Sequence, residues 1–301
     1  MAELLEPGLR EIFDAAVSRP DPLMERLFGV RGSTKRTEHF MSMGSVGRVP
    51  VFDGTVPYTD FRGGYKTSIL NYEFALGMTV ERALVDDEQY SEINQRAQGL
   101  GDAFAVTREI DAADVFINGF TDSGSTRYGE STNGADGVGL LSTAHPFSPS
   151  NTGDTQSNEG TLSLSLANMD TTRQAMLNYT DDQGELLGIS PDLLLIPPEL
   201  ERTANQIVSE RANFEPGSAQ FDVNMFAGRL TPIVWNRLTD SNAWFMIDSR
   251  LMAQRLIWLN RQPPEFARQD DFDGLQAKFR GYMRYGIGWT DWRWIHGQNP
   301  S

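Results

Sequence analysis

The residues best suited to nucleophilic catalysis gather around His145. Ser142 and Thr143 lie just before it in the chain, and a serine, a histidine and a carboxylate such as Asp136 are the components of a hydrolase triad. A spacing of three residues in a loop does not by itself bring a nucleophile and its base together. We therefore interpret His145 as a structural histidine, and a hydrolase that uses Ser142, His145 and Asp136 is the alternative.

The remaining polar residues match no common metal or cofactor motif. The other histidines, His39 and His296, belong to no HExxH pattern, and the motifs GxSxG, GxxxxGK[ST] and strand-linked GxGxxG are missing from the sequence. The acidic residues before Gly274 are Asp270, Asp271 and Asp273. Their spacing departs from that of a calcium-binding EF-hand loop, so a solvated turn is the better interpretation. We expect no catalytic residue, no metal site and no cofactor.

The charge of the chain argues against nucleic-acid binding. The 41 acidic and 26 basic residues give a net charge of −15, whereas phosphate binding requires patches of lysine and arginine. Trp289, Trp292 and Trp294 surround Arg293 in a pattern that could stack on bases. With so negative a charge, we expect instead a strand that packs on a neighbouring domain or subunit.

Other features exclude further classes of protein. The 301 residues contain no cysteine, which removes disulfides, thiolate catalysis and zinc–thiolate sites. No apolar run approaches the ~18 residues of a membrane span, and the first residues lack the cationic and apolar regions of a signal peptide. We expect a soluble globular protein of one large core or two smaller ones.

A long helix organises the middle of the chain. From Asp86 to Phe120 apolar residues recur at steps of three and four, no proline interrupts, and Asp86, Asp87 and Glu88 lie where the positive end of the helix dipole would be. About 34 residues would form a rod of roughly 50 Å. Gly99 and Gly101 lower the helix propensity, so we expect close packing or a bend there.

The other predicted elements surround this helix. Two short helices near 11–17 and 23–28 are separated by two prolines and form an arm. Asp53-Gly54 predicts the turn of a projecting hairpin with strands at 49–52 and 55–58. Further strands are expected at 72–80, 191–196, 231–235, 244–247 and 279–294, helices at 165–179 and 199–210, and surface loops at 121–139, 148–160 and 214–222.

Several segments, in this order, resemble a known family. They are the strand Tyr72-Glu73-Phe74 leading to Val85–Tyr90 and the long helix, then Ser142-Thr143-Ala144-His145-Pro146, then Pro191–Leu200 (PDLLLIPPEL), then Asp240–Phe245, and finally Gly288–Arg293 (GWTDWR). This order is similar to that of the major capsid proteins of tailed double-stranded DNA bacteriophages, close to the Mu-like major head subunits. The match runs from about Phe40 to near the C-terminus.

The resemblance implies an α+β chain with the Hong Kong 97-type fold. The N-terminal arm would be 1–39, the extended loop 40–78, the peripheral domain 79–160 and 248–301 with the long helix as its spine, and the axial domain 161–247. The implied function is a non-enzymatic shell subunit that forms pentamers and hexamers around the genome. An encapsulin-type nanocompartment shell is a second possibility within the same fold.

The resemblance also implies partners. They are copies of the chain itself, a separate scaffolding protein, a portal, decoration proteins in some relatives, and packaged DNA held without sequence specificity; a membrane is not expected. Assembly would take place in the host cytoplasm. No long helical scaffolding segment precedes the arm, and Lys66 in the expected extended loop is a single lysine that does not by itself predict covalent cross-linking.

Overall fold

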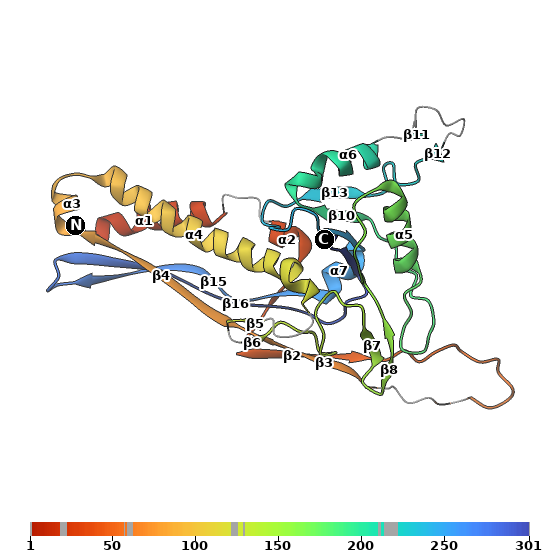
Figure 1. The fold of residues 1–301 in the computed structure, drawn as a ribbon. Coiled ribbons are helices and arrows are strands. Elements are labelled where there is room, and N and C mark those ends of the chain that lie inside the picture. Colours follow the sequence, from red (N-terminus) through yellow and green to blue (C-terminus); the bar gives the residue numbers. More distant parts are fainter. Residues whose placement is uncertain are drawn as a thin grey trace. The chain divides into compact units, whose positions relative to one another are not determined.

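The computed structural model describes residues 2–18, 23–56, 58, 63–121, 126–128, 130–209, 212–213 and 222–300. Helices and strands alternate along the chain, as expected for an α+β fold (Figure 1). The chain divides into two compact units. Unit 1 consists of Met1–Glu38, Ile69–Ala112 and Trp258–Ile287, and unit 2 of His39–Ser68, Ala113–Ile257 and Gly288–Ser301. In the described part of the chain, no helix is both long and apolar enough to cross a membrane.

Unit 1 is built on a four-stranded sheet. The order of its strands is β1-β15-β16-β4, with β1 at Gly29–Gly32, β15 at Leu256–Asp271, β16 at Gln276–Trp289 and β4 at Tyr72–Glu81. The helices are α1 (Ala2–Ser18), α2 (Leu23–Leu27), α3 (Arg82–Asp86) and α4 (Tyr90–Ile117), of which α4 continues into unit 2. Strands β16 and β4 are antiparallel, and their register runs from Gln276 opposite Glu81 to Tyr285 opposite Tyr72.

Aromatic side chains hold the N-terminal helix inside unit 1. Phe13 of α1 is fully buried, and its ring lies 5.6 Å from that of Phe104 on α4 and 5.2 Å from that of Phe266 on β15. Such aromatic contacts add to the gain from burying the rings. The prediction of two helices at the N-terminus is confirmed.

The long helix is confirmed, but it begins later than predicted. Helix α3 ends in a Schellman motif, in which Gln89 N–H donates to Leu84 O at 2.9 Å and Glu88 N–H to Val85 O at 3.2 Å. Glu88 takes the left-handed conformation that this motif requires, with φ 56°. Asp86 therefore ends α3, Asp87 and Glu88 form a turn between two helices, and α4 of 28 residues starts at Tyr90.

The two glycines of α4 have different environments. A Cβ on Gly101 would lie 2.6 Å from Phe13 O and 2.7 Å from Ala16 Cβ, so α1 approaches α4 at this point more closely than any other residue would allow. A Cβ on Gly99 would meet no atom within 4 Å. Close packing is therefore confirmed for Gly101 and wrong for Gly99.

Unit 2 contains a five-stranded sheet of order β13-β10-β14-β17-β9. These strands are β13 (Thr231–Val234), β10 (Leu193–Ile196), β14 (Trp244–Ile247), β17 (Ile295–Gln298) and β9 (Glu159–Gly160). Strand β10 lies parallel to β13 and antiparallel to β14. All four residues of β14 are buried, as are three of the four in β10. The predicted strands at 191–196, 231–235 and 244–247 are confirmed.

The remaining elements of unit 2 are short. The helices are η1 (Asn118–Phe120), α5 (Leu166–Leu177), η2 (Pro198–Leu200), α6 (Glu201–Ser209) and α7 (Ser249–Arg255). Two-stranded pairs are formed by β2 (Thr37–Met43) with β3 (Gly63–Leu70), β5 (Thr126–Arg127) with β6 (Glu130–Ser131), β7 (His145–Ser148) with β8 (Asn151–Gln156), and β11 (Ala212–Asn213) with β12 (Asp222–Val223). Ser165 caps α5 by accepting a hydrogen bond from Asn168 N–H at 3.2 Å, as the sequence favours.

Two further expectations are corrected by the structure. The hairpin centred on Asp53-Gly54 does not form, because the described residues 44–56 contain no strand and Pro50 has no amide hydrogen to donate to a ladder. The residues that pair are β2 and β3, on either side of this segment. The expected loop at 148–160 contains β8 and β9. The loop expected at 214–222 lies almost wholly outside the described residues.

We predict opposite effects of alanine at the two glycines of α4. Gly101→Ala should lower the free energy of unfolding by about 1–3 kcal/mol, because α1 must move away from the new methyl group. Gly99→Ala should raise it by up to about 1 kcal/mol, because alanine is the better helix former and the site is open. Urea denaturation of both variants measures these changes, and two changes of equal sign would contradict the assignment.

We also predict that stability falls below pH 6.5 because of His296. Its Nδ1 lies 2.7 Å from the Tyr179 hydroxyl in the buried core, and burial lowers its pKa from 6.5 to about 4. The unfolded chain binds the proton more readily, so protonation between pH 6.5 and 4 costs up to roughly 3 kcal/mol of unfolding free energy. The slope of stability against pH over this range should shrink in His296→Gln and persist in His39→Gln, whose imidazole is exposed. An unchanged slope in His296→Gln would contradict this account.

Candidate functional site

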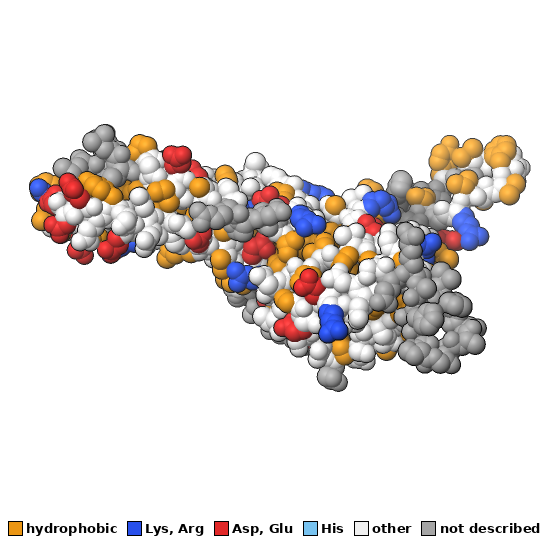
Figure 2. Space-filling model, turned by 90° about the horizontal axis from the view of Figure 1, so that it is seen from above, with side chains coloured by type: hydrophobic (Ala, Val, Ile, Leu, Met, Phe, Trp, Pro, Cys, Tyr) orange, Lys and Arg blue, Asp and Glu red, His pale blue; other side chains and the backbone are white. Residues whose placement is uncertain are grey.

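Among the residues that the structure describes, the largest group of exposed apolar side chains lies on β2 and the connection from β2 to β3. Within the extended loop expected at 40–78, residues 44–62 connect the two strands, and we call these residues the loop. Val49 is 95 % exposed, Val51 93 % and Tyr58 95 %. The other exposed apolar residues of the loop and of β2 are Met41, Met43, Val46, Phe52 and Val56. Figure 2 shows the loop at its right edge, with apolar side chains gathered on it.

The backbone of the extended loop keeps these side chains away from their own chain. Gly47 and Gly54 adopt positive φ angles of 77° and 107°, and a Cβ on either would meet no atom within 4 Å. The described part of the loop forms no ladder, and Pro50 prevents one locally. A contiguous exposed apolar surface of this kind marks a site of interaction with another molecule.

The base of the loop is fastened to the turn that follows α5. Ser45 N–H donates to Asp182 Oδ1 at 2.7 Å, and Arg48 Nε lies 2.7 Å from Glu185 Oε1. The Arg48 side chain is 83 % exposed, so water screens this ion pair and it contributes little to holding the loop. The position of the loop base is therefore set mainly by the hydrogen bond from Ser45 N–H to Asp182.

The turn itself is rigid. Asp181 Oδ1 accepts hydrogen bonds from Gln183 N–H at 2.8 Å and Glu185 N–H at 2.9 Å, and Gly184 has φ 83°. Burial would raise the pKa of Asp181, but these hydrogen bonds outweigh it and lower the pKa. The turn therefore holds Asp182 in place as the acceptor for Ser45.

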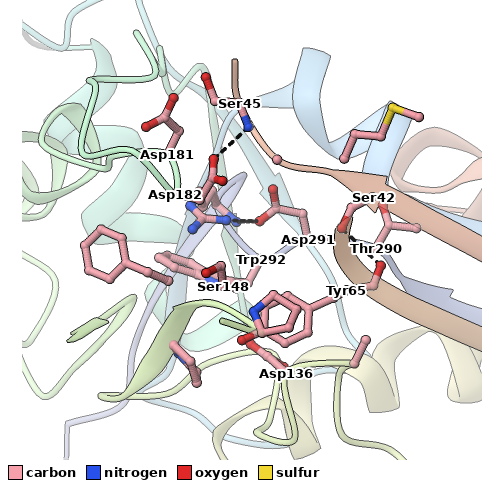
Figure 3. A pocket seen from close by; sticks show the side chains of 18 of the residues that line it. Ser42, Ser45, Tyr65, Asp136, Ser148, Asp181, Asp182, Thr290, Asp291 and Trp292 are labelled. Atoms are coloured by element: carbon pink, nitrogen blue, oxygen red, sulfur yellow. Dashed lines mark hydrogen bonds and ion pairs between the residues drawn. The ribbon is translucent and has the colours of Figure 1, made fainter. Parts of the chain in front are cut away.

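A cavity of about 290 Å³ lies beneath the loop base, within unit 2 (Figure 3). Its walls come from β2, β3, the β7–β8 turn, the turn after α5 and residues 289–293. Two guanidinium groups share one carboxylate there, since Arg255 Nη1 pairs with Asp291 Oδ2 and Arg293 Nη1 lies 3.2 Å from Asp291 Oδ1. Burial lowers the pKa of Arg255 to about 10 and also lowers that of Arg293. Burying these charges costs desolvation energy. The ion pairs in return hold Arg255, at the end of α7, against residues 291–293.

His145 lies beside this cavity in a buried hydrogen-bonding network. Its Nδ1 is 2.7 Å from Asp136 Oδ2, and its Nε2 is 3.0 Å from Asn158 Oδ1. Asn158 also accepts from Ser142 N–H at 2.9 Å and donates to Leu140 O at 2.9 Å. The imidazole stacks on Trp292 with ring centres 4.3 Å apart. The network therefore joins residues 136–158 to one another and, through the stacked ring, to the distant Trp292.

The geometry does not arrange Ser142 and His145 as a nucleophile and its base. Asp136 and His145 are in contact, as the hydrolase alternative requires, but the Nε2 atom faces Asn158 instead of the serine hydroxyl. Ser142 Oγ accepts a hydrogen bond from Ala144 N–H at 3.2 Å, and both Ser142 and His145 are 0 % exposed. The arrangement supports the structural interpretation of His145.

The acidic cluster at 270–273 forms a hairpin turn in unit 1. Asp271 pairs with Lys278 at 2.7 Å and accepts from Gly274 N–H at 3.1 Å, while Asp270 pairs with Arg268. Within the described ranges, no group of three histidine, aspartate or glutamate residues is placed to bind a metal ion. The turn predicted from the sequence is confirmed.

The sequence did not reveal three members of the site. Asn158 lies in a polar stretch that reads as a surface loop, yet it is 0 % exposed. No sequence motif indicated that Arg255 and Arg293 would share the Asp291 carboxylate, because Arg255 lies far from Asp291 in the chain. The tryptophans at 292 and 294 do not form a strand on a neighbouring domain or subunit, because both are buried in the core of unit 2, where Trp294 lies 6.2 Å from Phe116.

We predict that His145→Ala lowers the free energy of unfolding by roughly 2–4 kcal/mol. The change leaves Asp136 as a carboxylate only 8 % exposed without its partner, and it removes the ring that stacks on Trp292. His39→Ala is the control, since that imidazole is exposed and should change stability by less than about 0.5 kcal/mol. Thermal unfolding measures both, and equal effects would contradict the importance of the network.

Comparisons with known proteins agree with this geometry. The sequence profile of the family described as phage capsid protein matches residues 64–296. No curated protein sequence matches the chain. Among solved structures, the virus-like particle from Pyrococcus furiosus is similar with a TM-score of 0.55 and 12% identity, over 97% of this chain and 98% of that one.

Two phage structures are similar to a comparable degree. A protein of Mycobacterium phage Bobi has a TM-score of 0.56 and 13% identity, over 93% of this chain and 90% of that one. The procapsid of bacteriophage JBD30 has a TM-score of 0.53 and 14% identity, over 100% of this chain and 75% of that one. These likenesses support the Hong Kong 97-type fold that the sequence resemblance implies. The chain belongs to the phage capsid protein family and is a shell-forming major capsid subunit.

Proposed function

We propose that this chain assembles into pentamers and hexamers, which build an icosahedral shell around a phage genome. The observation that carries the proposal is the extended loop, whose apolar side chains are exposed while its base is fixed to unit 2. A second copy of the chain supplies the cover that the subunit itself does not provide.

The energy available from this contact is large. Fully burying a valine, phenylalanine or tyrosine side chain contributes about 1.5–3 kcal/mol, and the loop exposes six such side chains between Val46 and Tyr58. Part of this gain offsets the lost freedom of the loop and of the subunits. Because each subunit both gives a loop and receives one, the gain is repeated around a closed ring.

The proposed organisation follows the family. The N-terminal arm is 1–39, the extended loop 40–78, the peripheral domain 79–160 and 248–301, and the axial domain 161–247. This functional division differs from the two compact units. A bend of the spine helix near Gly99 and Gly101 during maturation is part of the same proposal.

The proposed partners are a separate scaffolding protein, a portal, decoration proteins and packaged double-stranded DNA. The net charge of −15 favours DNA that is enclosed but not held by sequence-specific contacts. The proposed role is structural and not enzymatic, with assembly in the host cytoplasm.

A nanocompartment shell of the encapsulin type is the second candidate. The likeness to the virus-like particle from Pyrococcus furiosus, over nearly the full length of both chains, favours it. The family match to phage capsid proteins favours the first. Particles purified from the native source distinguish them, because a capsid contains DNA and a nanocompartment contains protein cargo.

We predict that the triple change Val49→Ser, Val51→Ser and Phe52→Ser abolishes assembly and leaves the stability of the free subunit within about 0.5 kcal/mol. These side chains are 95, 93 and 68 % exposed, so the subunit loses no internal contact. Sedimentation and electron microscopy of the purified protein, with its scaffolding protein present, measure assembly. Val30→Ser is the control, an exposed valine outside the loop. Normal particles from the triple variant would overturn the proposal.

A further inference from the structure

The turn between β15 and β16 exposes two large apolar side chains. Phe272 is 90 % exposed and Leu275 is 60 % exposed. The residues around them are acidic, namely Asp270, Asp271 and Asp273. We call residues 272–275 the hairpin tip.

The hairpin tip is held in one conformation by polar contacts. Asp271 accepts from Gly274 N–H at 3.1 Å and pairs with Lys278 at 2.7 Å. A Cβ on Gly274 would lie 2.8 Å from Asp271 Oδ2, so a larger residue there would displace the carboxylate. The Leu275 carbonyl accepts from Arg82 N–H at 3.0 Å. The apolar side chains are therefore presented on a fixed frame.

Leu275 is an unfavourable residue for its position. Its φ is +49°, in the left-handed region where glycine or asparagine fits best and where a leucine is strained. A glycine there would relieve the strain and reduce the exposed apolar surface at the same time. In the free subunit Leu275 has a strained backbone and an exposed apolar side chain. A residue with both of these disadvantages indicates a function in a bound state.

Unit 1 also contains a surface that complements the tip. Along β16, Lys278, Arg280, Tyr282 and Arg284 alternate with the buried Phe279 and Met283, and so lie on the opposite face of the sheet. Arg280 pairs in register with Gly77 of β4, and Tyr282 with Ala75. The small side chains of β4 leave the face beside Arg280 and Tyr282 uncovered.

This face contains positive charge that its own chain does not neutralise. Arg280 is exposed and forms no ion pair or side-chain hydrogen bond with any residue that the structure describes. Arg284 pairs with Glu73 at 3.1 Å, yet its Nε is buried without an acceptor in the described structure. At the tip, Asp273 is exposed and likewise forms no side-chain bond within the described residues.

We infer that the hairpin tip docks on a second copy of this chain, on the face of β16 around Arg280. Phe272 and Leu275 bury against Tyr282 and the small residues of β4, and Asp273 of one copy meets Arg280 of the other. Acidic flanks make the tip a poor ligand for phosphate or for an anionic membrane, whereas charge complementarity favours the basic face. The inference rests on the proposed function, because it adds a contact to the shell beside the extended loop.

Leu275→Gly provides the sharpest test, because stability and assembly should change in opposite directions. The variant should unfold at a higher temperature than the natural chain and require about tenfold more protein for assembly, the factor expected when one large apolar side chain no longer becomes buried. Phe272→Ser should act on assembly in the same way, and Phe272→Leu should restore it. Wild-type assembly by Leu275→Gly would overturn the inference.

A charge exchange tests the partner surface. Asp273→Arg and Arg280→Asp should each raise the concentration needed for assembly several-fold, and the double variant should restore it. The assay uses the full chain without DNA, so a role of Arg280 in DNA binding would leave the single variants unchanged and overturn the inference. A natural chain that forms no shell would instead refute the proposed function. Shells from the natural chain together with unaffected single variants would refute only the docking of the tip.

Discussion

The apolar surface of the extended loop is the constraint on which the rest of the subunit depends. Val49, Val51 and Tyr58 remain in water in the single chain, and this surface becomes favourable only when another molecule covers it. The surrounding structure is arranged to present the loop and not to bury it. The bond from Ser45 to Asp182 and the rigid turn after α5 fix the base of the loop.

The network around His145 illustrates how a catalytic pattern can serve a structural purpose. A serine, a histidine and an aspartate lie close together in the sequence, and two of the three are in contact in the structure. The third position is taken by Asn158, whose amide binds both the imidazole and the backbone of residues 140–142. Full burial and the stacking on Trp292 give the histidine a role in joining segments of unit 2.

Patterns within a single element were predictable from the sequence, and contacts between elements were not. The period of 3.6 residues located α4, and the apolar run at 193–196 located β10. The start of α4 was misplaced because three acids favour a helix N-terminus, whereas the Schellman motif at Glu88 depends on a preceding helix that has little signal of its own. Asn158 and Arg293 could not be recognised, since their roles depend on partners distant in the chain. The order of several short motifs, and not any physical pattern, predicted the family.

The contrast between the fixed base and the free tip of the extended loop has a kinetic consequence. Two subunits can bury apolar surface by contact between their two loops, or by contact between the loop of one and the folded body of the other. Only the second contact belongs to the proposed shell, so the two kinds of encounter compete for the same side chains. Encounters of the wrong kind become more frequent as free subunits accumulate. When subunits are supplied slowly, growing shells remove them and the concentration of free subunits stays low. Slow supply therefore yields more closed particles than a rapid rise in the concentration of free subunits. On the proposed role of the loop, the contact that builds the shell also limits how fast the shell can be built.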